Sequence, residues 1–489
     1  MLFNSHIFML LFLPLLLAGW YFLNWKKKFQ LAQGYLIGMS LWFYAYANLQ
    51  YLWLLLFSCL IGWLLSCVPE KISSEKGKKV LTGVGCVFHL GLLGYFKYSN
   101  FFLENLNTVF HTDFPMLQIL LPVGISFYTF QQLAYLIDRC RGDAPRDSFF
   151  DYLTFMVYFP QLLQGPILLR SEFMGQLKEP ERRRFHAERF SEGIQFFVFG
   201  LAKKVLLADT LAKAVNYGYS NVSMLDSISA LLLAVGYLTE LYFDFSGYCD
   251  MAVGLGKMIG LEVAENFDAP FHSASVKEFW RRWHMTLGRF FTRYVYIPLG
   301  GNRRGKMRTL CNVMIVMLLS GLWHGAAWTF VLWGFLHGVG MIWDNLEHPH
   351  LPKKWMRQAA TFAYVCMTFV FFRAESIAQG IDVLKSIVSL KWNGFVFQMA
   401  SALDMTECYM ITKALSMKLP GLLSWFWLGI FVVLIAICFR VLSGEKVSGV
   451  VALQRQKGYG RLYPVLLAVL FTWSMISMTG VSEYLYFSF

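Results

Sequence analysis

Long apolar runs recur along the whole chain, and charged residues collect between them. With their flanks, these runs reach roughly the 18 residues that a helix needs to cross a membrane. The pattern predicts an all-α polytopic membrane bundle of about ten to twelve spans. Re-entrant and interfacial helices are expected in addition to these spans. The clearest runs are residues 7–21, 51–68, 228–243, 362–372, 422–438 and 465–478.

Basic residues follow the first apolar run and set the orientation of the chain. Lys26, Lys27 and Lys28 come soon after residues 7–21, and the positive-inside rule places them in the cytoplasm. No small-residue cleavage site follows this run, so we expect a retained helix and not a signal peptide. The sequence therefore predicts a multi-pass membrane protein whose N-terminus lies outside.

Two stretches do not fit a simple alternation of spans and loops. Residues 150–169 are apolar, but basic loops expected in the cytoplasm lie on both sides of them. Pro160, Gly165 and Pro166 would break a straight helix there, and broken backbone at membrane depth needs protein or a water-filled cavity around it. We therefore expect a re-entrant segment beside a cavity. Residues 257–308 are basic and aromatic, which favours an interfacial strip.

Composition supports lipid as the solvent and narrows the chemistry. The chain is 57% hydrophobic and 15% charged, whereas soluble domains carry about 25% charged residues. Its net charge of +13 lies in short clusters between apolar runs, which indicates topology and not nucleic-acid binding. Nine cysteines without paired spacing make a disulfide framework or a zinc site unexpected. No P-loop, nucleophile elbow or dinucleotide fingerprint occurs in a fitting context.

His324 is the first candidate for chemistry. It lies in Ser320-Gly-Leu-Trp-His-Gly-Ala-Ala-Trp, between two apolar runs, with glycines on both sides. Glycines allow backbone or substrate to approach closely, and a neutral imidazole can take a proton from a hydroxyl and later return it. The alternative is a packed, hydrogen-bonded histidine at a helix break.

His284 is the second candidate, because it follows a basic and aromatic stretch. Lys277, Arg281, Arg282 and Trp283 precede it. The basic residues could bind the phosphates of a cytosolic donor such as coenzyme A. The alternative is an interfacial anchor that contacts anionic lipid headgroups.

A third cluster of polar residues follows the run 228–243. Asp244, Ser246 and Asp250 could orient a histidine or pair with an arginine, or they could only cap and end a helix. Lys203 and Lys204 present a similar choice between snorkelling and ion pairing.

These motifs together resemble the membrane-bound O-acyltransferase (MBOAT) superfamily, and within it the membrane subunits of bacterial alginate O-acetyltransferases. The resemblance covers about residues 120–375. The motifs that carry it are Pro122-Val-Gly-Ile-Ser-Phe-Tyr-Thr-Phe-Gln, Gln164-Gly-Pro-Ile, Gly200-Leu-Ala-Lys-Lys, Phe243-Asp-Phe-Ser-Gly-Tyr, Glu278-Phe-Trp-Arg-Arg-Trp-His, Tyr296-Ile-Pro-Leu-Gly-Gly-Asn-Arg, Gly321-Leu-Trp-His-Gly and Phe371-Phe-Arg-Ala-Glu.

The resemblance implies a function and a site. His324 matches the catalytic histidine of the family, and His284 matches its second characteristic polar position. A helical bundle would surround a funnel or tunnel in the bacterial inner membrane. Acetyl-CoA or an acyl carrier protein thioester would enter from the cytoplasm as donor substrate, with no bound prosthetic group and no metal. The acceptor would come from the other side, with an extracytoplasmic transferase or accessory protein as partner.

The aromatic C-terminal motif, residues 482–489, adds a further expectation. Tyr484-Leu-Tyr-Phe-Ser-Phe resembles an ending of polymer-modifying members in which a tyrosine is thought to carry the acyl group onward. Tyr486 would then be the first acyl acceptor. The alternative is an aromatic belt at a helix end.

We therefore expect residues 1–489 to form a single membrane domain with the catalytic core at 120–375. The expected activity is O-acetylation of an extracytoplasmic polysaccharide of alginate, cellulose or peptidoglycan type. One alternative is a D-alanyl transferase of the teichoic-acid type that uses an acyl carrier protein. A transporter of polysaccharide or small molecules is the alternative from another class, although the repeated halves of many transporters are not found.

Overall fold

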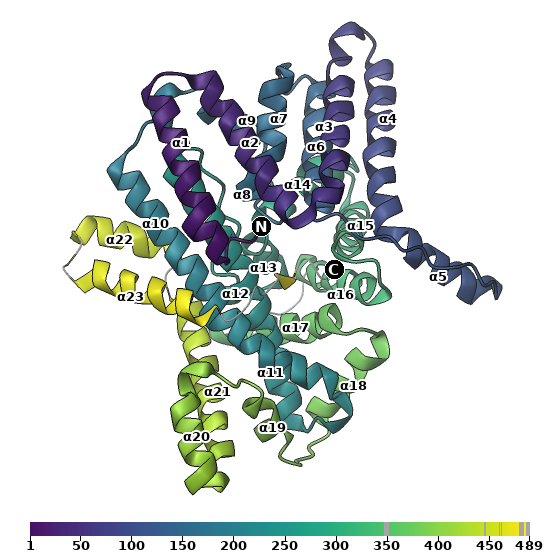
Figure 1. Cartoon of the computed structure of the whole chain (residues 1–489). Coiled ribbons are helices and arrows are strands. Elements are labelled where there is room, and N and C mark those ends of the chain that lie inside the picture. Colours follow the sequence, from purple (N-terminus) through teal and green to yellow (C-terminus); the bar gives the residue numbers. More distant parts are fainter. Residues whose placement is uncertain (347–351, 445, 459, 461, 479–483, 486–489) are drawn as a thin grey trace. The chain divides into compact units, whose positions relative to one another are not determined.

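The computed structural model describes the chain except residues 347–351, 445, 459, 461, 479–483 and 486–489 (Figure 1). Within the described residues every regular element is a helix, and none is a strand. The predicted all-helical fold is therefore confirmed. Several π-helical segments join consecutive α-helices, such as Lys203–Ala208 between α10 (Ala187–Ala202) and α11 (Asp209–Ser220).

Six of the described helical segments are long and apolar enough to cross a membrane. Fewer segments meet this criterion than the ten to twelve spans that the apolar runs predict. One reason is that inner helices are short and carry polar residues: α6 (Ile125–Arg141) includes Gln131, Gln132 and Asp138 and is buried along most of its length. The six segments are Phe8–Trp25, Leu49–Lys71, Glu75–Phe110, Ser227–Ile259, Lys306–His324 and Pro420–Leu442.

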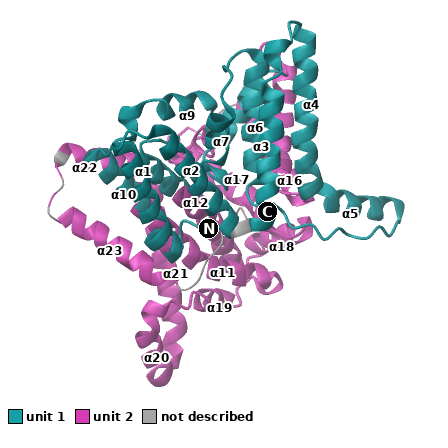
Figure 2. Cartoon of the chain, turned by 45° about the horizontal axis from the view of Figure 1, so that its top comes forward, with its two compact units in different colours: residues 1–197, 249–265, 286–298 teal, residues 198–248, 266–285, 299–489 magenta. Residues whose placement is uncertain are grey.

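The chain divides into two compact units whose residues alternate along the sequence (Figure 2). Unit 1 contains residues 1–197, 249–265 and 286–298, and unit 2 contains residues 198–248, 266–285 and 299–489. Three helices contribute residues to both units, namely α10 (Ala187–Ala202), α12 (Ser227–Ile259) and α14 (Met285–Phe291). Neither unit is one continuous stretch of sequence.

Unit 1 is built around α6. Helices α3, α4 and α7 all pack against it. An ion pair helps to close this unit, since Arg293 binds Asp138 at 3.0 Å. The remaining helices of unit 1 are α1 (Leu13–Trp25), α2 (Phe29–Asn48), α3 (Leu52–Ser66), α4 (Glu75–Leu93), α5 (Ser99–Phe110), α7 (Phe149–Val157), α8 (Phe159–Leu162) and α9 (Arg170–Leu177).

The helix break predicted around Pro160 is present. Helix α7 ends at Val157, α8 has only four residues, and no regular element follows until α9 begins. Residues 158–168 are all buried. Their backbone and side chains are bonded to neighbouring segments, because the Tyr158 hydroxyl donates to the Leu261 carbonyl (2.8 Å) and the Ile167 amide donates to Thr286 Oγ1 (3.0 Å). Protein therefore surrounds the broken backbone, as physical chemistry requires at membrane depth.

Unit 2 contains both candidate histidines. Residues 266–285 and 299–305, which are the part of the basic and aromatic strip in this unit outside α15, form short helices and loops. The helices of unit 2 are α11 (Asp209–Ser220), α13 (Val276–Arg282), α15 (Lys306–His324), α16 (Trp328–Asn345), α17 (Lys354–Arg373), α18 (Ile377–Val388), α19 (Phe395–Ser401), α20 (Tyr409–Lys418), α21 (Pro420–Leu442), α22 (Val447–Lys457) and α23 (Leu462–Ser477).

Glycines bring α15 and α16 into close contact next to His324. A Cβ atom at Gly321 would lie 2.3 Å from the Phe330 carbonyl oxygen, and one at Gly334 would lie 2.4 Å from the Met317 carbonyl oxygen. Any side chain at these positions would push the helices apart. Gly321, which lies about one turn before His324, therefore lets the end of α15 pack directly against α16.

Candidate active site

His324 is the last residue of α15, where the helix ends. The next residue, Gly325, is extended (φ −157°, ψ 153°), so the chain leaves the helix axis at once. The His324 side chain is 3% exposed. Aromatic rings surround its imidazole, at centroid distances of 4.9 Å to Trp323, 5.1 Å to Trp333 and 5.2 Å to Phe372. The ring is therefore shielded from water on several sides.

His284 lies in a strained backbone conformation between α13 and α14. Its φ of 45° is left-handed, a region that few residues other than glycine adopt and that often marks functional positions. Its side chain is fully buried. Nδ1 lies 3.2 Å from Asn266 Oδ1, and the ring packs edge-on against Phe245 at 4.8 Å. The Met285 amide also donates to the Asn266 carbonyl (3.0 Å). Asn266 therefore fixes both the backbone and the ring of His284.

The two candidate histidines lie close together in unit 2. Their ring centroids are 6.5 Å apart, and the Trp323 ring is 6.1 Å from that of His284. A base that takes a proton becomes a cation, and the C-terminal end of a helix stabilises a cation through the helix dipole. The end of α15 is thus a favourable place for an imidazole that gains and returns a proton.

Burial keeps His284 neutral. Loss of hydration lowers the pKa of its imidazole to about 3, because the charged form is the one that water stabilises most. A histidine in the unfolded chain has a pKa of about 6.5. The unfolded chain therefore binds this proton more tightly than the folded chain does. The contribution of His284 to stability is complete above pH 6.5 and is lost as pH falls toward 3.

Because the pKa of His284 is lower in the folded than in the unfolded chain, His284 contributes to the loss of stability in acid. Between pH 6.5 and 4.5 we expect the native protein to lose roughly 2 kcal/mol of stability from this residue. A His284→Gln variant should lack this part of the loss in thermal unfolding at the two pH values. His186→Gln is the control, because His186 is exposed. Equal acid losses in native protein and His284→Gln would contradict a buried neutral imidazole.

The predicted donor-binding residues lie on or next to α13. Lys277 Nζ donates to Asn345 Oδ1 (2.8 Å), and Arg282 forms an ion pair with Glu278 (2.8 Å). Arg281 is exposed and Arg282 is half-buried. The helix therefore presents cations at its surface, close in sequence to His284.

Trp283 takes a different place from these basic residues. It is 2% exposed and lies inside an aromatic cluster, with ring centroids 5.1 Å from Phe267, 5.4 Å from Phe279 and 5.5 Å from Phe369. This packing fixes Trp283, which is the residue directly before His284.

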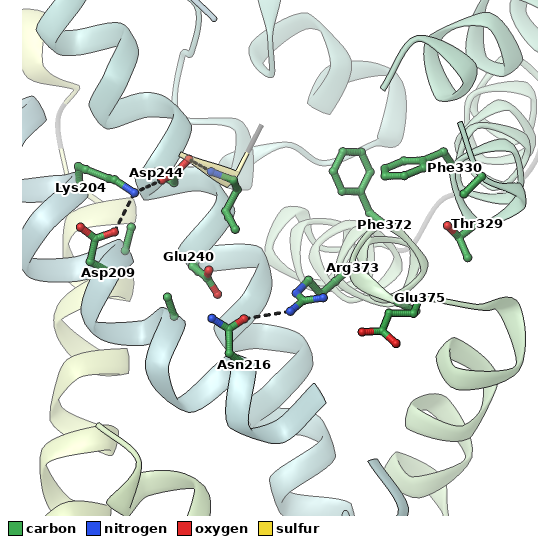
Figure 3. Close-up of a pocket in the computed structure, with 15 residues that line it drawn as sticks. Lys204, Asp209, Asn216, Glu240, Asp244, Thr329, Phe330, Phe372, Arg373 and Glu375 are labelled. Atoms are coloured by element: carbon green, nitrogen blue, oxygen red, sulfur yellow. Dashed lines mark hydrogen bonds and ion pairs between the residues drawn. The ribbon is translucent and has the colours of Figure 1, made fainter. Parts of the chain in front are cut away.

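A cavity of about 640 Å³ lies in unit 2 (Figure 3). Phe330 and Phe372 line it, and Phe372 also contacts the His324 ring. One aromatic side chain therefore borders both the candidate base and the cavity. Alanines and Leu485 also line the cavity, and its polar lining residues are Lys204, Asp209, Asn216, Glu240, Asp244, Thr329, Arg373 and Glu375.

Lys204 and Asp244 form a buried ion pair at this cavity. Lys204 Nζ lies 2.6 Å from Asp244 Oδ1 and 2.8 Å from Asp209 Oδ1, and the Lys204 and Asp244 side chains are 2% and 1% exposed. Ion pairing and not snorkelling thus accounts for Lys204. The suggestion that Asp244 ends a helix is wrong, because α12 continues to Ile259. Lys204 offsets the charge of the carboxylate, so the helix can carry it through the core.

The same ion pair contacts Tyr484 and Leu485 of the aromatic C-terminal motif. The Leu485 amide donates to Asp244 Oδ2 (3.1 Å), and Leu485 lines the cavity. Tyr484 is fully buried, with the Lys204 ammonium 4.7 Å from its ring centroid and the Tyr248 ring edge-on at 5.1 Å. Tyr486, the predicted acyl carrier, lies outside the described residues.

Comparison with known proteins identifies the family. Residues 141–380 match the model of MBOAT, the membrane-bound O-acyltransferase family. A peptidoglycan O-acetyltransferase of Helicobacter pylori is 35% identical over 423 residues, which cover 80% of this chain and 80% of that protein. The chain belongs to the MBOAT family. A probable alginate O-acetylase, AlgI, of Azotobacter vinelandii is 39% identical over 389 residues, 77% of this chain and 76% of that protein.

MBOAT membership makes the chain an acyltransferase, and with its apolar helices a multi-pass protein of the bacterial inner membrane. The chain is also similar, at lower identity, to proteins named for transfer of D-alanine and not of acetyl. A teichoic acid D-alanyltransferase of Streptococcus thermophilus is 28% identical over 253 residues, 49% of this chain and 58% of that protein. The longer matches are to relatives named for O-acetylation.

Sequence reasoning missed two polar residues of this MBOAT site. Asn266 lies in the basic and aromatic strip and was not distinguished from its neighbours. Glu240 lies within the apolar run 228–243, and a carboxylate at such depth is a functional candidate by default. The presence of a carboxylate within an apolar run could therefore have identified Glu240 from the sequence. Only the fold could connect Asn266 with His284.

Proposed function

We propose that this protein moves an acetyl group from a cytosolic thioester donor to a hydroxyl, for O-acetylation of an extracytoplasmic polysaccharide of alginate, cellulose or peptidoglycan type. The observation that carries the proposal is the closeness of His324 and His284, together with Phe372, which packs against His324 and lines a cavity that also carries polar groups. The names of the relatives, an alginate O-acetylase and a peptidoglycan O-acetyltransferase, support the acyl group and the class of acceptor.

In the proposed reaction His324 acts as the general base. It takes the proton of the acceptor hydroxyl, whose oxygen then attacks the thioester carbonyl carbon. The carbon–sulfur bond breaks, the thiolate leaves, and the proton held by His324 passes to the sulfur. His284 stays neutral and positions the reacting groups. Alignment of both substrates in a water-poor site supplies much of the rate through orientation.

The donor is proposed to be acetyl-CoA, or alternatively an acyl carrier protein thioester. Lys277, Arg281 and Arg282 would bind its phosphates, since guanidinium groups make paired hydrogen bonds to phosphate oxygens. The exposure of Arg281 supports this role. Trp283 would act indirectly, by holding this strip against the aromatic cluster.

The first acceptor is proposed to be the hydroxyl of Tyr486, which would pass the acetyl group to an extracytoplasmic transferase and then to the polymer. Support comes from the residues before it, because Tyr484 is buried against Lys204 and Leu485 lines the cavity. An aromatic belt alone would not require a buried tyrosine at 484.

The test uses acetyl-CoA carrying a labelled acetyl group and purified protein in lipid. We expect coenzyme A release with one label per chain, found on Tyr486 by peptide mass spectrometry, and no label in Tyr486→Phe. Tyr484→Phe is the matched control and should keep the label. Label on another residue would refute the relay. Release only from an acylated carrier protein would favour the D-alanyl type of donor.

A further inference from the structure

The indole N–H of Trp333 is buried beside His324 and has no hydrogen-bond partner among the described residues. Trp333 lies in α16 and is 1% exposed, and its ring centroid is 5.1 Å from that of His324. Buried tryptophan N–H groups usually find an acceptor, because a buried donor without one loses its hydration and gains nothing in return. This open donor therefore indicates a ligand oxygen next to the candidate base.

Other tryptophans of the chain follow the usual rule. Trp20, which is fully buried in unit 1, donates to the Ile259 carbonyl oxygen (3.0 Å). Trp280, whose ring contacts that of Trp333, donates to Nδ1 of His337 (3.2 Å). Trp333 differs from both, because its donor stays available although aromatic side chains pack around its ring.

Packing holds the Trp333 ring in one place. Its centroid lies 4.8 Å from that of His337, 5.5 Å from that of Phe369 and 5.1 Å from that of Phe372. The next residue, Gly334, belongs to the close glycine contact between α15 and α16, so Trp333 and the end of α15 keep their relative position. A donor that is placed before the substrate arrives costs no reorganisation during the reaction.

The chemistry of acyl transfer selects the oxygen that such a donor serves. In the proposed reaction the acceptor hydroxyl gives its proton to His324, and its oxygen attacks the thioester carbonyl carbon. The π electrons of the carbonyl bond move to the carbonyl oxygen, which stays negative until the carbon–sulfur bond breaks and the thiolate leaves. The attacking oxygen loses charge in the same step. A hydrogen-bond donor accelerates the reaction where charge increases, and this is the carbonyl oxygen.

His284 is less suited to this role. Its Nδ1 lies 3.2 Å from Asn266 Oδ1, and an amide oxygen only accepts hydrogen bonds. Nδ1 therefore carries the proton of the neutral ring, and Nε2 of that ring is an acceptor. The indole of Trp333, by contrast, is a donor in every protonation state of the site.

We propose that Trp333 is a catalytic residue, whose N–H donates to the carbonyl oxygen of the thioester and stabilises the oxyanion of the tetrahedral intermediate. The attacking oxygen and the carbonyl oxygen are attached to one carbon, so the base and the donor must be neighbours. The contact of the His324 and Trp333 rings meets this requirement. The inference deepens the proposed function and rests on it for the thioester. It holds for any acceptor hydroxyl, because the carbonyl oxygen belongs to the acyl donor.

The experiment measures coenzyme A release in a single turnover by the full chain in lipid, at several concentrations of acetyl-CoA. One variant is Trp333→Phe, and a second replaces Trp333 by benzothienylalanine, which keeps the ring shape but has sulfur in place of the N–H. We expect the maximal rate to fall about tenfold or more in both variants. The half-saturating concentration should stay within about twofold of native, because the contact strengthens in the transition state.

The matched control replaces Trp280 by benzothienylalanine, which removes an N–H from the same aromatic cluster that is already bonded to His337. Its maximal rate should stay within about threefold of native. Dithioacetyl-CoA, which has sulfur in place of the carbonyl oxygen, is a second acyl donor. Because sulfur is a weak acceptor, the Trp333 variants should lose less than about threefold with it.

Three results would overturn the inference and leave the proposed function intact. They are a loss below about tenfold with acetyl-CoA, equal losses with both acyl donors, and a comparable loss in the Trp280 control. The last would show that ring packing and not the N–H sets the rate. If native protein released nothing from acetyl-CoA or from an acylated carrier protein, the proposed function itself would be overturned, and this inference with it.

Discussion

His324→Ala protein should release coenzyme A from acetyl-CoA at least about a hundredfold more slowly than native protein, because it lacks the proposed general base. The imidazole lies at the C-terminal end of α15, where a developing positive charge is stabilised. The measurement is initial release by purified protein in lipid, with equal folding checked by thermal unfolding.

The matched control is His337→Gln. His337 is also buried, but its two ring nitrogens are bonded to Trp280 Nε1 (3.2 Å) and Thr368 Oγ1 (2.9 Å). This accounts for it as a structural residue, and glutamine can keep one of these bonds. We expect its release rate within about threefold of native, since no transition-state contact is removed. Comparable losses in both variants would mean that the effect of His324→Ala is one of packing.

Lys204→Met should destabilise the protein by about 3–5 kcal/mol, the cost of removing one partner from a buried ion pair. The substitution leaves Asp244 buried with 1% of its side chain exposed and without its cation. It also removes the ammonium above the Tyr484 ring. Thermal and denaturant unfolding in one detergent measure the change.

Lys203→Met is the matched control, because Lys203 precedes Lys204 but is only half-buried. It should cost less than about 1 kcal/mol. Asp244→Asn added to Lys204→Met should recover part of the loss, because it removes the unpaired charge. A loss in Lys204→Met no larger than that in Lys203→Met would show that the buried pair does not stabilise this fold.

Much of the helical architecture could be predicted from the order of apolar residues. The break at Pro160 was predictable too, because proline removes a backbone donor and clashes with the preceding turn. Six described segments meet a length and hydropathy criterion for a span, whereas the sequence predicts ten to twelve spans. Core helices such as α6 exchange apolar for polar side chains where they face protein and not lipid, and a hydropathy pattern does not separate these two environments.

The site was predictable in its parts but not in its connections. His324 stood out because glycines flank it within apolar sequence. The contact of Asn266 with His284 depends on two loops that meet through the Met285 amide. The ion pair of Lys204 and Asp244 joins residues 40 positions apart. Such pairings depend on tertiary packing, for which one sequence gives no spacing rule.

The alternation of the two units along the sequence has a consequence for biosynthesis. Unit 1 includes residues 1–197 but also 286–298, so it cannot close until more than half of the chain has been made. The first helices of unit 1 are therefore made before residues 249–265 and 286–298, which complete the unit. Non-local closure of this kind slows folding and exposes incomplete intermediates. We therefore expect the N-terminal helices to keep unpacked faces until residues 286–298 have been made.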